Sequence, residues 1–389
     1  MAVREKDVKL FPVLKYPGGK EKELKYILPN LPGACNRYYE PFVGGGAVYF
    51  SLESDAYYIN DKSTELINLY NMIKTQNAEF FQKLNAIDHN WTLMEQIIDN
   101  HTEELVRIYL DYKQNQMNIT QLKDTISEFV FRNAEEFNGL LKRSFNVAIE
   151  NFVVELNKSF ENKIIRMKKL EEQKGDLKVE DIVHNLECAF KNAFYMHFRY
   201  LYNHVAELEI SVPFATAVYF FVREFCYASM FRYNRQGKFN VPYGGISYNK
   251  KSIMKKIQYF TDEQLIRQLK NTTVENMDFE AFFQKHTPKE NDFIFLDPPY
   301  DTEFSTYAQN EFGKKDQIRL ADFLIKQCKA NFMLIIKNTD FIRGLYPANH
   351  ETANGKQLYV GKFDKKYVVS FQDRNDKDAE HLLITNYQI

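Results

Sequence analysis

The sequence predicts an α/β protein in which a mostly parallel, doubly wound sheet is interrupted by a long helical insert. Apolar runs of strand length alternate with helical stretches in two separate segments, residues 1–75 and 271–389, and alternation of this kind builds parallel sheets. Residues 76–270 instead carry apolar side chains at helical spacing, most clearly over 179–194. We therefore expect one discontinuous sheet domain and one mainly helical domain.

The first segment predicts two strands joined by a glycine-rich turn. Arg37–Val43 and Ala56–Asn60 are the strand candidates. Between them, GGGAVYFSLES (residues 44–54) predicts a glycine turn that opens a helix. A further helix is expected to start near Ser63.

The second segment predicts four more strands and one helix. The helix is expected near 314–329, and the strand candidates are 293–296, 332–336, 367–371 and 381–385. Only the polar stretch 372–380 separates the last two strands, which is too short for a crossover helix. We therefore expect an antiparallel hairpin at the edge of the sheet.

The composition is that of an ordinary soluble globular protein. Of 389 residues, 44% are hydrophobic and 26% are charged, and the formal net charge is −1. No stretch approaches eighteen uncharged apolar residues, and the N-terminus lacks a signal-peptide pattern, so we expect no membrane association and a cytoplasmic location. The four cysteines are far apart and show no CxxC spacing, which disfavours disulfides and a zinc site. We expect no metal.

The most distinctive motif is Asp297-Pro298-Pro299-Tyr300, which directly follows the apolar run Phe293–Leu296. In open α/β sheets, ligands bind at the carboxyl ends of strands. The motif combines an acceptor carboxylate, two residues without a backbone N–H group, and an amphipathic ring. This combination suits binding of an exocyclic amine on a flat heterocycle, whereas the alternative is a strand ended by a proline turn.

A second motif, Glu40-Pro41-Phe42-Val43-Gly44-Gly45-Gly46, follows the first predicted strand. Glycines let the backbone turn sharply and approach a ligand closely. Asp61 lies 17 residues after Gly44, near the position at which an acid meets ribose hydroxyls in nucleotide-binding βαβ units. Asp61 could also cap the helix near Ser63, and the two roles are compatible.

Two further motifs are weaker when taken alone. Lys15-Tyr16-Pro17-Gly18-Gly19-Lys20 is not a phosphate-binding loop, because Glu21 follows the lysine where Ser or Thr is required. Between residues 223 and 256, eight Lys and Arg side chains and several aromatic rings accompany a single acid. This pattern fits a nucleic-acid partner, although a solvated basic surface is the alternative.

Taken together, LKYPGGK, EPFVGGGAVYF, FRYNRQGKFNVPYGG and FLDPPY resemble, in this order, the motifs of Dam-type DNA adenine N6-methyltransferases of the alpha group. The resemblance covers roughly residues 10–75 and 215–389. It implies a Rossmann-like class I methyltransferase sheet, with the insert as target-recognition domain. It also implies S-adenosylmethionine as methyl donor and an adenine flipped out of duplex DNA as acceptor.

The resemblance further implies roles for individual residues. The catalytic motif is Asp297, Pro298, Pro299 and Tyr300. The cofactor contacts are Tyr16 (often Trp in this family), Lys20, Glu40, Phe42, Gly44, Gly46, Asp61, Asp278 and Asp297. The DNA contacts are Arg232, Asn234, Arg235 and Lys238 in a basic hairpin near 230–245, with Tyr307 in a loop that closes over the active site.

The expected partner is therefore double-stranded DNA, with a GAT-containing target, and the enzyme is expected to be a monomer or a weak dimer. A cognate restriction endonuclease would make it part of a restriction-modification system; without one it would be an orphan methylase. Residues 90–190 exceed the compact family members by about a hundred residues, which leaves their role open. The rival functions are methylation of RNA adenine or of a protein glutamine, and DNA binding by a regulator with a vestigial pocket.

Overall fold

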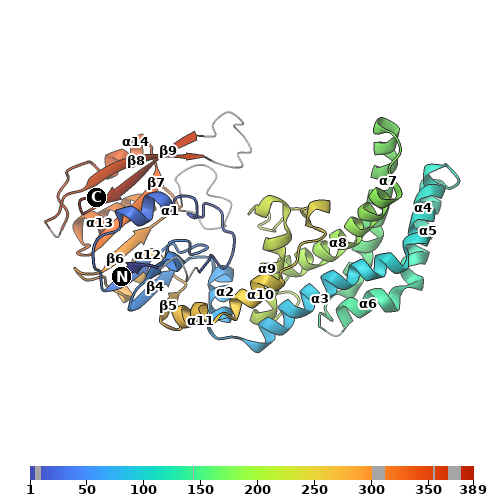
Figure 1. Cartoon of the computed structure of the whole chain (residues 1–389), viewed down its shortest axis with the longest axis horizontal. Coiled ribbons are helices and arrows are strands. Elements are labelled where there is room, and N and C mark those ends of the chain that lie inside the picture. Colours follow the sequence, from blue (N-terminus) through green and yellow to red (C-terminus); the bar gives the residue numbers. More distant parts are fainter. Residues whose placement is uncertain (5–9, 143, 300–311, 354, 367–377) are drawn as a thin grey trace. The chain divides into compact units, whose positions relative to one another are not determined.

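Contacts within the chain divide it into two units. The computed structural model describes residues 1–4, 10–142, 144–299, 312–353, 355–366 and 378–389 (Figure 1). The first unit comprises Met1–Thr75 with Phe260–Ile389, and the second comprises Gln76–Tyr259. Helix α11 (Glu263–Lys270), which the sequence assigned to the insert, belongs to the first unit because it packs against α2 (Thr64–Lys74) and β5 (Thr272–Glu275).

Both ends of the chain contribute strands to one central sheet, as the blue, orange and red arrows of Figure 1 show. Among the described residues its order is β5-β4-β2-β6-β7-β9-β8. The pairs from β5 to β7 are parallel, and β9 is antiparallel to both β7 and β8. The mainly parallel sheet expected from the sequence is therefore confirmed. Besides β5, its strands are β2 (Arg37–Glu40), β4 (Ala56–Asn60), β6 (Phe293–Leu296), β7 (Asn331–Lys337), β8 (Tyr359–Lys366) and β9 (Asp378–Thr385).

The central strands are buried on both faces, which explains why their sequences are apolar without alternation. All four residues of β6 are buried. On one face, Tyr39, Ile294 and Leu334 join a single apolar cluster with α12 (Phe279–Lys285), α13 (Lys314–Lys326) and α14 (Asp340–Leu345). Side chains alternate along a strand, so the neighbouring residues Tyr38 and Phe293 form a ring pair of their own, 6.1 Å apart.

Two predicted elements differ from the structure. The helix expected after the glycine turn is a single 3₁₀ turn, η2 (Tyr49–Ser51), because the chain then extends as β3 (Leu52–Glu53) and pairs with β1 (Ala2–Val3). Tyr49, Phe50 and Leu52 are all buried, so the side chains form no one-sided helical stripe. The first predicted strand ends at Glu40, before Pro41. The strand expected at 367–371 lies outside the described residues.

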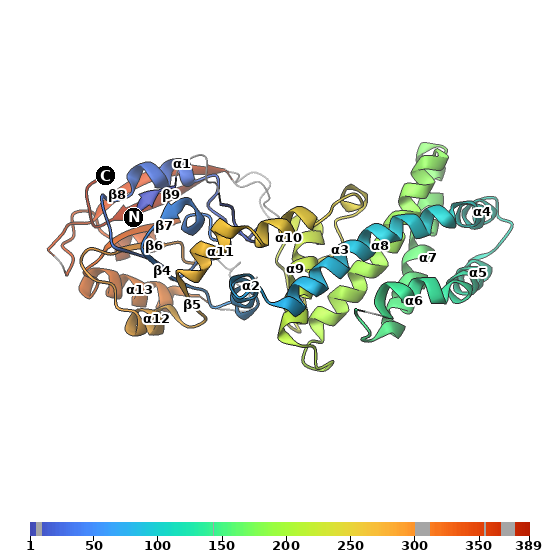
Figure 2. The same cartoon turned by 60° about the horizontal axis from the view of Figure 1, so that its bottom comes forward.

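The second unit is helical, as the spacing predicts. Figure 2 shows α3 running beside α8, and the two helices are in contact. Side-chain caps on Asn77, Asn118 and Ser211 mark three helix starts. Its helices are α3 (Ala78–Asn100), α4 (Thr102–Lys113), α5 (Ile119–Arg132), α6 (Ala134–Lys142), α7 (Ile149–Lys174), α8 (Val179–Asn203), α9 (Val212–Phe225) and α10 (Met254–Phe260).

Aromatic rings form the core where α3, α8 and α9 meet. The ring of Trp91 lies 6.1 Å from Phe194, 5.6 Å from Phe221 and 4.5 Å from Phe225. Tyr243, beyond the end of α9, lies 5.7 Å from the same indole. Such ring clusters bury large apolar areas and stabilise the junction of the three helices. Within the described part of the chain, no helix is long and apolar enough to cross a membrane.

A buried histidine makes the stability of the helical unit depend on pH. His197 on α8 is fully buried, its Nε2 has no partner among the described residues, and burial lowers its pKa to about 3. The unfolded chain binds the proton near pH 6.5. We therefore expect the free energy of unfolding to fall by up to ~1.4 kcal/mol per pH unit from this group, from about pH 6.5 towards pH 3.

Urea unfolding at several pH values tests this expectation. His197→Phe, which suits the neighbouring rings of Phe152 and Phe198, should flatten the dependence of unfolding free energy on pH. The exposed His89 on α3 provides the control, because His89→Gln should keep the wild-type dependence. Equal slopes for His197→Phe and wild type would contradict the role of His197.

Candidate functional site

Four acidic residues gather at one edge of the sheet because four neighbouring parallel strands end there. Glu40 is the last residue of β2, Asp61 and Asp297 directly follow β4 and β6, and Asp278 lies three residues beyond β5. The chain runs from β2 outward to β4 and β5 and then returns to β6 on the other side of β2. This reversal is the topological switch point at which open α/β sheets bind ligands.

The glycine turn after β2 is held against β4 and against the N-terminal segment. Val43 N–H donates to the Asn60 carbonyl (3.0 Å). A Cβ atom on Gly45 would lie 2.6 Å from the Leu14 carbonyl oxygen, and one on Gly46 would lie 2.6 Å from the Tyr70 hydroxyl oxygen. The backbone can approach these neighbours only without side chains. The glycines are therefore required by the packing of the turn itself.

Asp61 links the glycine turn to the start of α2. Its Oδ2 accepts from Gly44 N–H (3.0 Å), and its Oδ1 accepts from Ser63 N–H (2.9 Å). Burial raises the pKa of Asp61, while these two hydrogen bonds act in the opposite direction. The helix cap is Ser63, whose side chain accepts from Leu66 N–H. Each Asp61 oxygen keeps lone-pair capacity for a further donor.

The first and the last sequence motifs meet in one ion pair. Lys20 is only 3% exposed; its Nζ donates to the Gly18 carbonyl (2.9 Å) and pairs with the Asp297 carboxylate. The motif that is no phosphate-binding loop thus contributes a buried lysine to this edge. The Asp297 side chain is 19% exposed, so its carboxylate is held from within the protein and is still accessible. Tyr16, from the same turn, lies against Gly44.

Glu40 and Phe42 line the same edge with a buried acid and an aromatic surface. The Tyr38 hydroxyl donates to Glu40 (2.6 Å), and burial raises the pKa of Glu40 well above its usual value. The ring of Phe42 lies 5.7 Å from Phe279 and 5.4 Å from Phe312. Aromatic rings of this kind can pack against a flat heterocycle.

Asp278 lies at this edge and also stabilises the local structure. It is the N-cap of α12 and accepts from Glu280 N–H (3.0 Å). Arg319 of α13 donates to Asp278 (2.7 Å) and Asp316 (2.8 Å) and also pairs with Glu280. No sequence pattern indicated Arg319, because Asp316 meets Asp278 and Glu280 only in the folded chain.

Gln317 is a residue at the site that the sequence did not reveal. It lies in the first turn of α13 and is fully buried, and its Nε2 donates to the Pro299 carbonyl (2.9 Å). Its Oε1 has no partner within the described ranges. The two prolines offer no backbone N–H group of their own, so this side chain helps to hold the turn after β6. A single glutamine on an amphipathic helix carries no sequence signal of such a contact.

A second group of predicted residues lies in the helical unit, in a stretch we call the basic segment, residues 231–250. Arg232, Asn234 and Arg235 are exposed, and Lys238 is half-buried with its Nζ 2.8 Å from His204 Nε2. The segment turns tightly, since Asn234 N–H donates to the Lys238 carbonyl (2.8 Å). Asn234 Oδ1 accepts from the N–H groups of residues 236 and 238 and so stabilises the turn. A bidentate contact with adenine would require the same oxygen atom.

Tyr300 and the loop 304–307, including Tyr307, lie outside the described residues. In the part of the chain that the structure describes, no group of three His, Cys, Asp or Glu side chains could hold a metal ion.

Known proteins resemble this chain over different lengths. It is 34% identical to Type II methyltransferase M.CviBI of Paramecium bursaria Chlorella virus NC1A over 43% of this chain and 60% of that protein. Type II methyltransferase M.MjaIII of Methanocaldococcus jannaschii is 24% identical over 97% of this chain and 99% of its own length. The DNA adenine methylase of Haemophilus influenzae is 22% identical over 86% of this chain and 82% of its length.

The family comparison covers most of both units. The model of the D12 class N6 adenine-specific DNA methyltransferases matches residues 16–178 and 157–359. These ranges include the PGGK turn, the glycine turn, the basic segment and Asp297-Pro298-Pro299. The chain therefore belongs to the D12 class of N6 adenine-specific DNA methyltransferases.

Proposed function

We propose that this enzyme transfers the methyl group of S-adenosylmethionine to the N6 amine of an adenine flipped out of duplex DNA. The observation that carries the proposal is the Asp297 carboxylate, held by buried Lys20 at the switch point of the sheet. The glycine turn follows β2, the strand next to β6, and Asp61 follows β4, on the other side of β2. A nucleoside-binding edge and an amine acceptor thus share one site.

The residues present fit the cofactor. Asp61 retains acceptor capacity for ribose hydroxyls, Tyr16 and Phe42 offer rings, and Gly44 and Gly46 keep the turn free of side chains. Glu40, Lys20 and Asp278 complete the set that we assign to the cofactor. When bound, S-adenosylmethionine supplies a methyl group on a sulfonium, which is already activated for transfer, so alignment supplies much of the catalysis and the chemistry requires no metal.

Asp297 and Pro298 address the weak nucleophilicity of the adenine amine, whose lone pair is delocalised into the ring. We assign the two N–H groups of the amine to the Asp297 carboxylate and the Pro298 carbonyl, so that the nitrogen becomes pyramidal. Lys20 engages one carboxylate oxygen, which leaves the other for the amine. We propose that the ring of Tyr300 stacks on the adenine base once it has left the duplex. The released proton passes to Asp297 or to water.

The basic segment is our candidate for target recognition. Arg232 and Arg235 are exposed and arginine reads guanine edges with two hydrogen bonds. Lys238 and Asn234 shape the turn, and Tyr307 belongs to the proposed closing loop. We propose a GAT-containing target and action as a monomer or weak dimer in the cytoplasm. Relatives named Type II methyltransferases favour a paired restriction endonuclease over an orphan role.

The rival substrates are RNA adenine and protein glutamine. Exposed arginines among aromatic rings favour a nucleic acid over a protein. The intact Lys20–Asp297 and Asp61–Gly44 contacts disfavour a regulator with a vestigial pocket. Radiolabelled methyl transfer to duplex DNA, RNA and protein in parallel separates these functions: label in DNA adenine supports the proposal, and label only in RNA or protein contradicts it.

Replacing Asp297 tests the catalytic assignment. Asp297→Ala should lower methyl transfer at least ~100-fold, because the amine loses a charged acceptor, while DNA binding measured by fluorescence anisotropy is retained. Asp340→Ala removes a carboxylate that is 94% exposed on α14 and should leave transfer unchanged. Near wild-type turnover of purified Asp297→Ala would reject the assignment.

Replacing Arg232 tests target recognition. Arg232→Ala should relax or shift the base preference at one position, by ~1–3 kcal/mol of discrimination. Lys255→Ala, which removes an exposed lysine of α10, should weaken DNA binding equally for all sequences. Sequencing of methylated DNA from a methylation-free host measures the base preference, and fluorescence anisotropy measures the DNA binding. Identical methylation profiles for Arg232→Ala and the parent would show that Arg232 reads no base.

Replacing Gln317 tests how the turn after β6 is held. Gln317→Glu keeps the size of the side chain but, when ionised, cannot donate to the Pro299 carbonyl. We expect kcat to fall about tenfold at neutral pH, with recovery relative to wild type at lower pH, where the protonated carboxyl group can donate. Stopped assays at several pH values measure the ratio of the kcat of Gln317→Glu to that of wild type.

A second buried glutamine provides the matched control. Gln268 of α11 also donates to a backbone carbonyl, that of Tyr49 (2.9 Å). Gln268→Met should lower the free energy of unfolding but leave kcat unchanged. If Gln317→Glu showed a kcat ratio to wild type that does not vary with pH, the donor role of Gln317 would be rejected.

A further inference from the structure

The backbone of the basic segment is hydrogen-bonded at separate points but forms no continuous strand ladder among the described residues. Within the described ranges its β-type contacts are two isolated bridges, Tyr233 with Phe239 and Cys226 with Tyr243. An isolated hairpin is marginally stable at best. Its exposed arginines can discriminate between bases only if the backbone that carries them has one fixed path. Contacts from elsewhere in the unit must therefore fix this path.

Helix α8 supplies these contacts from residues spaced four apart. Asn203 accepts from Phe239 N–H (2.7 Å) and donates to the Phe239 carbonyl (3.0 Å). The Val241 carbonyl accepts from both Arg199 (3.2 Å) and the Tyr195 hydroxyl (2.9 Å). A spacing of four places side chains on one helix face. We call Lys191, Tyr195, Arg199 and Asn203 the α8 polar row.

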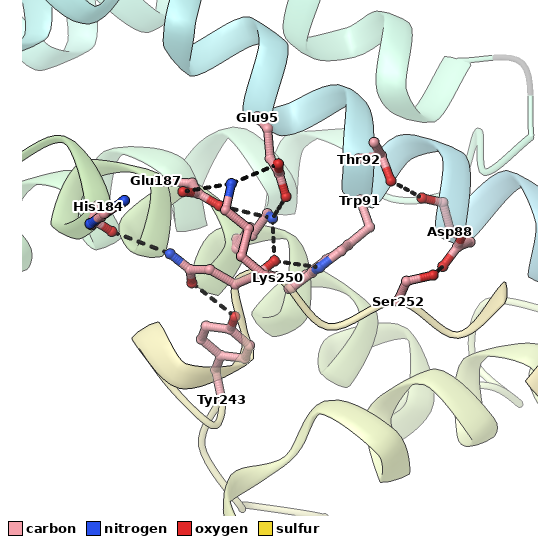
Figure 3. A network of polar contacts seen from close by, with 11 residues as sticks. Asp88, Trp91, Thr92, Glu95, His184, Glu187, Tyr243, Lys250 and Ser252 are labelled. Atoms are coloured by element: carbon pink, nitrogen blue, oxygen red, sulfur yellow. Dashed lines mark hydrogen bonds and ion pairs between the residues drawn. The ribbon is translucent and has the colours of Figure 1, made fainter. Parts of the chain in front are cut away.

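At the end of the basic segment, Asn249 is bound from several sides; Figure 3 labels three of the residues that bind it, Trp91, His184 and Tyr243. Its carbonyl accepts from Lys191 Nζ (2.5 Å) and from Trp91 Nε1 (3.3 Å). Its side chain accepts from the Tyr243 hydroxyl (3.1 Å) and donates to the His184 carbonyl (3.3 Å). Asn249 is only 3% exposed, so these bonds have little competition from water.

Lys191 is itself fixed by charge. Its side chain is 0% exposed, with Nζ 2.7 Å from Glu95 and 2.9 Å from Glu187. Lys250 also pairs with Glu95 (2.8 Å). Burial raises the pKa of Glu95, but hydrogen bonds from the two lysines outweigh it and leave that pKa below its usual value. Displacing Lys191 would separate its buried ammonium group from both acids, so its contact with Asn249 is held in place.

The net charge of residues 91–190 also indicates that their helices support the basic segment. Residues 91–190 contain 13 Lys and Arg against 18 Asp and Glu, whereas residues 223–256 contain eight against one. Phosphate binding requires an excess of basic side chains. The helices of residues 91–190 thus suit support of the basic segment better than contact with DNA.

We infer that the α8 polar row fixes the path of the basic segment, and that Lys191 is a positioning residue that determines how strictly the enzyme discriminates between DNA sequences. The inference rests on the proposed function, because discrimination presupposes that the basic segment reads DNA. It assigns helix α8 a role in specificity that requires no DNA contact of its own.

Lys191→Met tests the inference, since methionine keeps the apolar stem and removes the ammonium group. The discrimination ratio is kcat/KM on the target site divided by kcat/KM on a site with one base pair changed. We expect this ratio to fall at least about tenfold. We also expect backbone amides of residues 239–249 to exchange hydrogen at least about tenfold faster, as measured by mass spectrometry.

Lys113→Met is the matched control, because Lys113 also bridges two acids, Glu171 (3.0 Å) and Asp176 (2.9 Å), away from the basic segment. It should change neither readout. Asn203→Ala is a milder second variant at the other end of the row and should shift both readouts in the same direction as Lys191→Met.

Three outcomes would overturn the inference: wild-type discrimination in both row variants, unchanged exchange in both, or equal effects of Lys113→Met and Lys191→Met. If wild-type protein methylated no DNA, the proposed function would fail, and the exchange comparison would still decide whether Lys191 holds the segment.

Discussion

The site depends on one constraint, that neighbouring parallel strands end at the same edge of a sheet. In the order β5-β4-β2-β6, this constraint brings together Asp278, Asp61, Glu40 and Asp297, which are spread over most of the sequence. The reversal of strand order beside β2 places Glu40 and Asp297 on adjacent strands. Because the helical unit is inserted between β4 and β5, the sheet can carry it without any change in this arrangement.

Side-chain contacts across this edge then hold the candidate site residues in position. Lys20 orients the Asp297 carboxylate, and Asp61 binds the glycine turn through Gly44. The Lys20–Asp297 pair joins residues 277 positions apart in the sequence, so the N-terminal turn belongs to this edge of the sheet. In the helical unit, too, side chains hold a segment that is distant in sequence, since the α8 polar row donates hydrogen bonds to backbone carbonyls of the basic segment.

Much of the sheet and of the candidate site was predictable from the sequence. Buried strands such as β6 and β7 are short apolar runs, and the ordered motifs identified the family. Gln317, Arg319 and Lys191 were not predictable, because their partners lie elsewhere in the chain and no local pattern records such contacts. The helix expected after the glycine turn was wrong because pairing of β3 with β1 overrides local propensity.

The central claim is that the carboxyl edge of β2, β4 and β6 holds cofactor and target base together. A crystal structure with S-adenosylhomocysteine and a short duplex containing the methylated site measures this directly. The account predicts ribose hydroxyls on Asp61 and an extrahelical adenine whose amine donates to Asp297 and to the Pro298 carbonyl. A nucleoside bound elsewhere, or an adenine that stays stacked in the duplex with Asp297 empty, would contradict it.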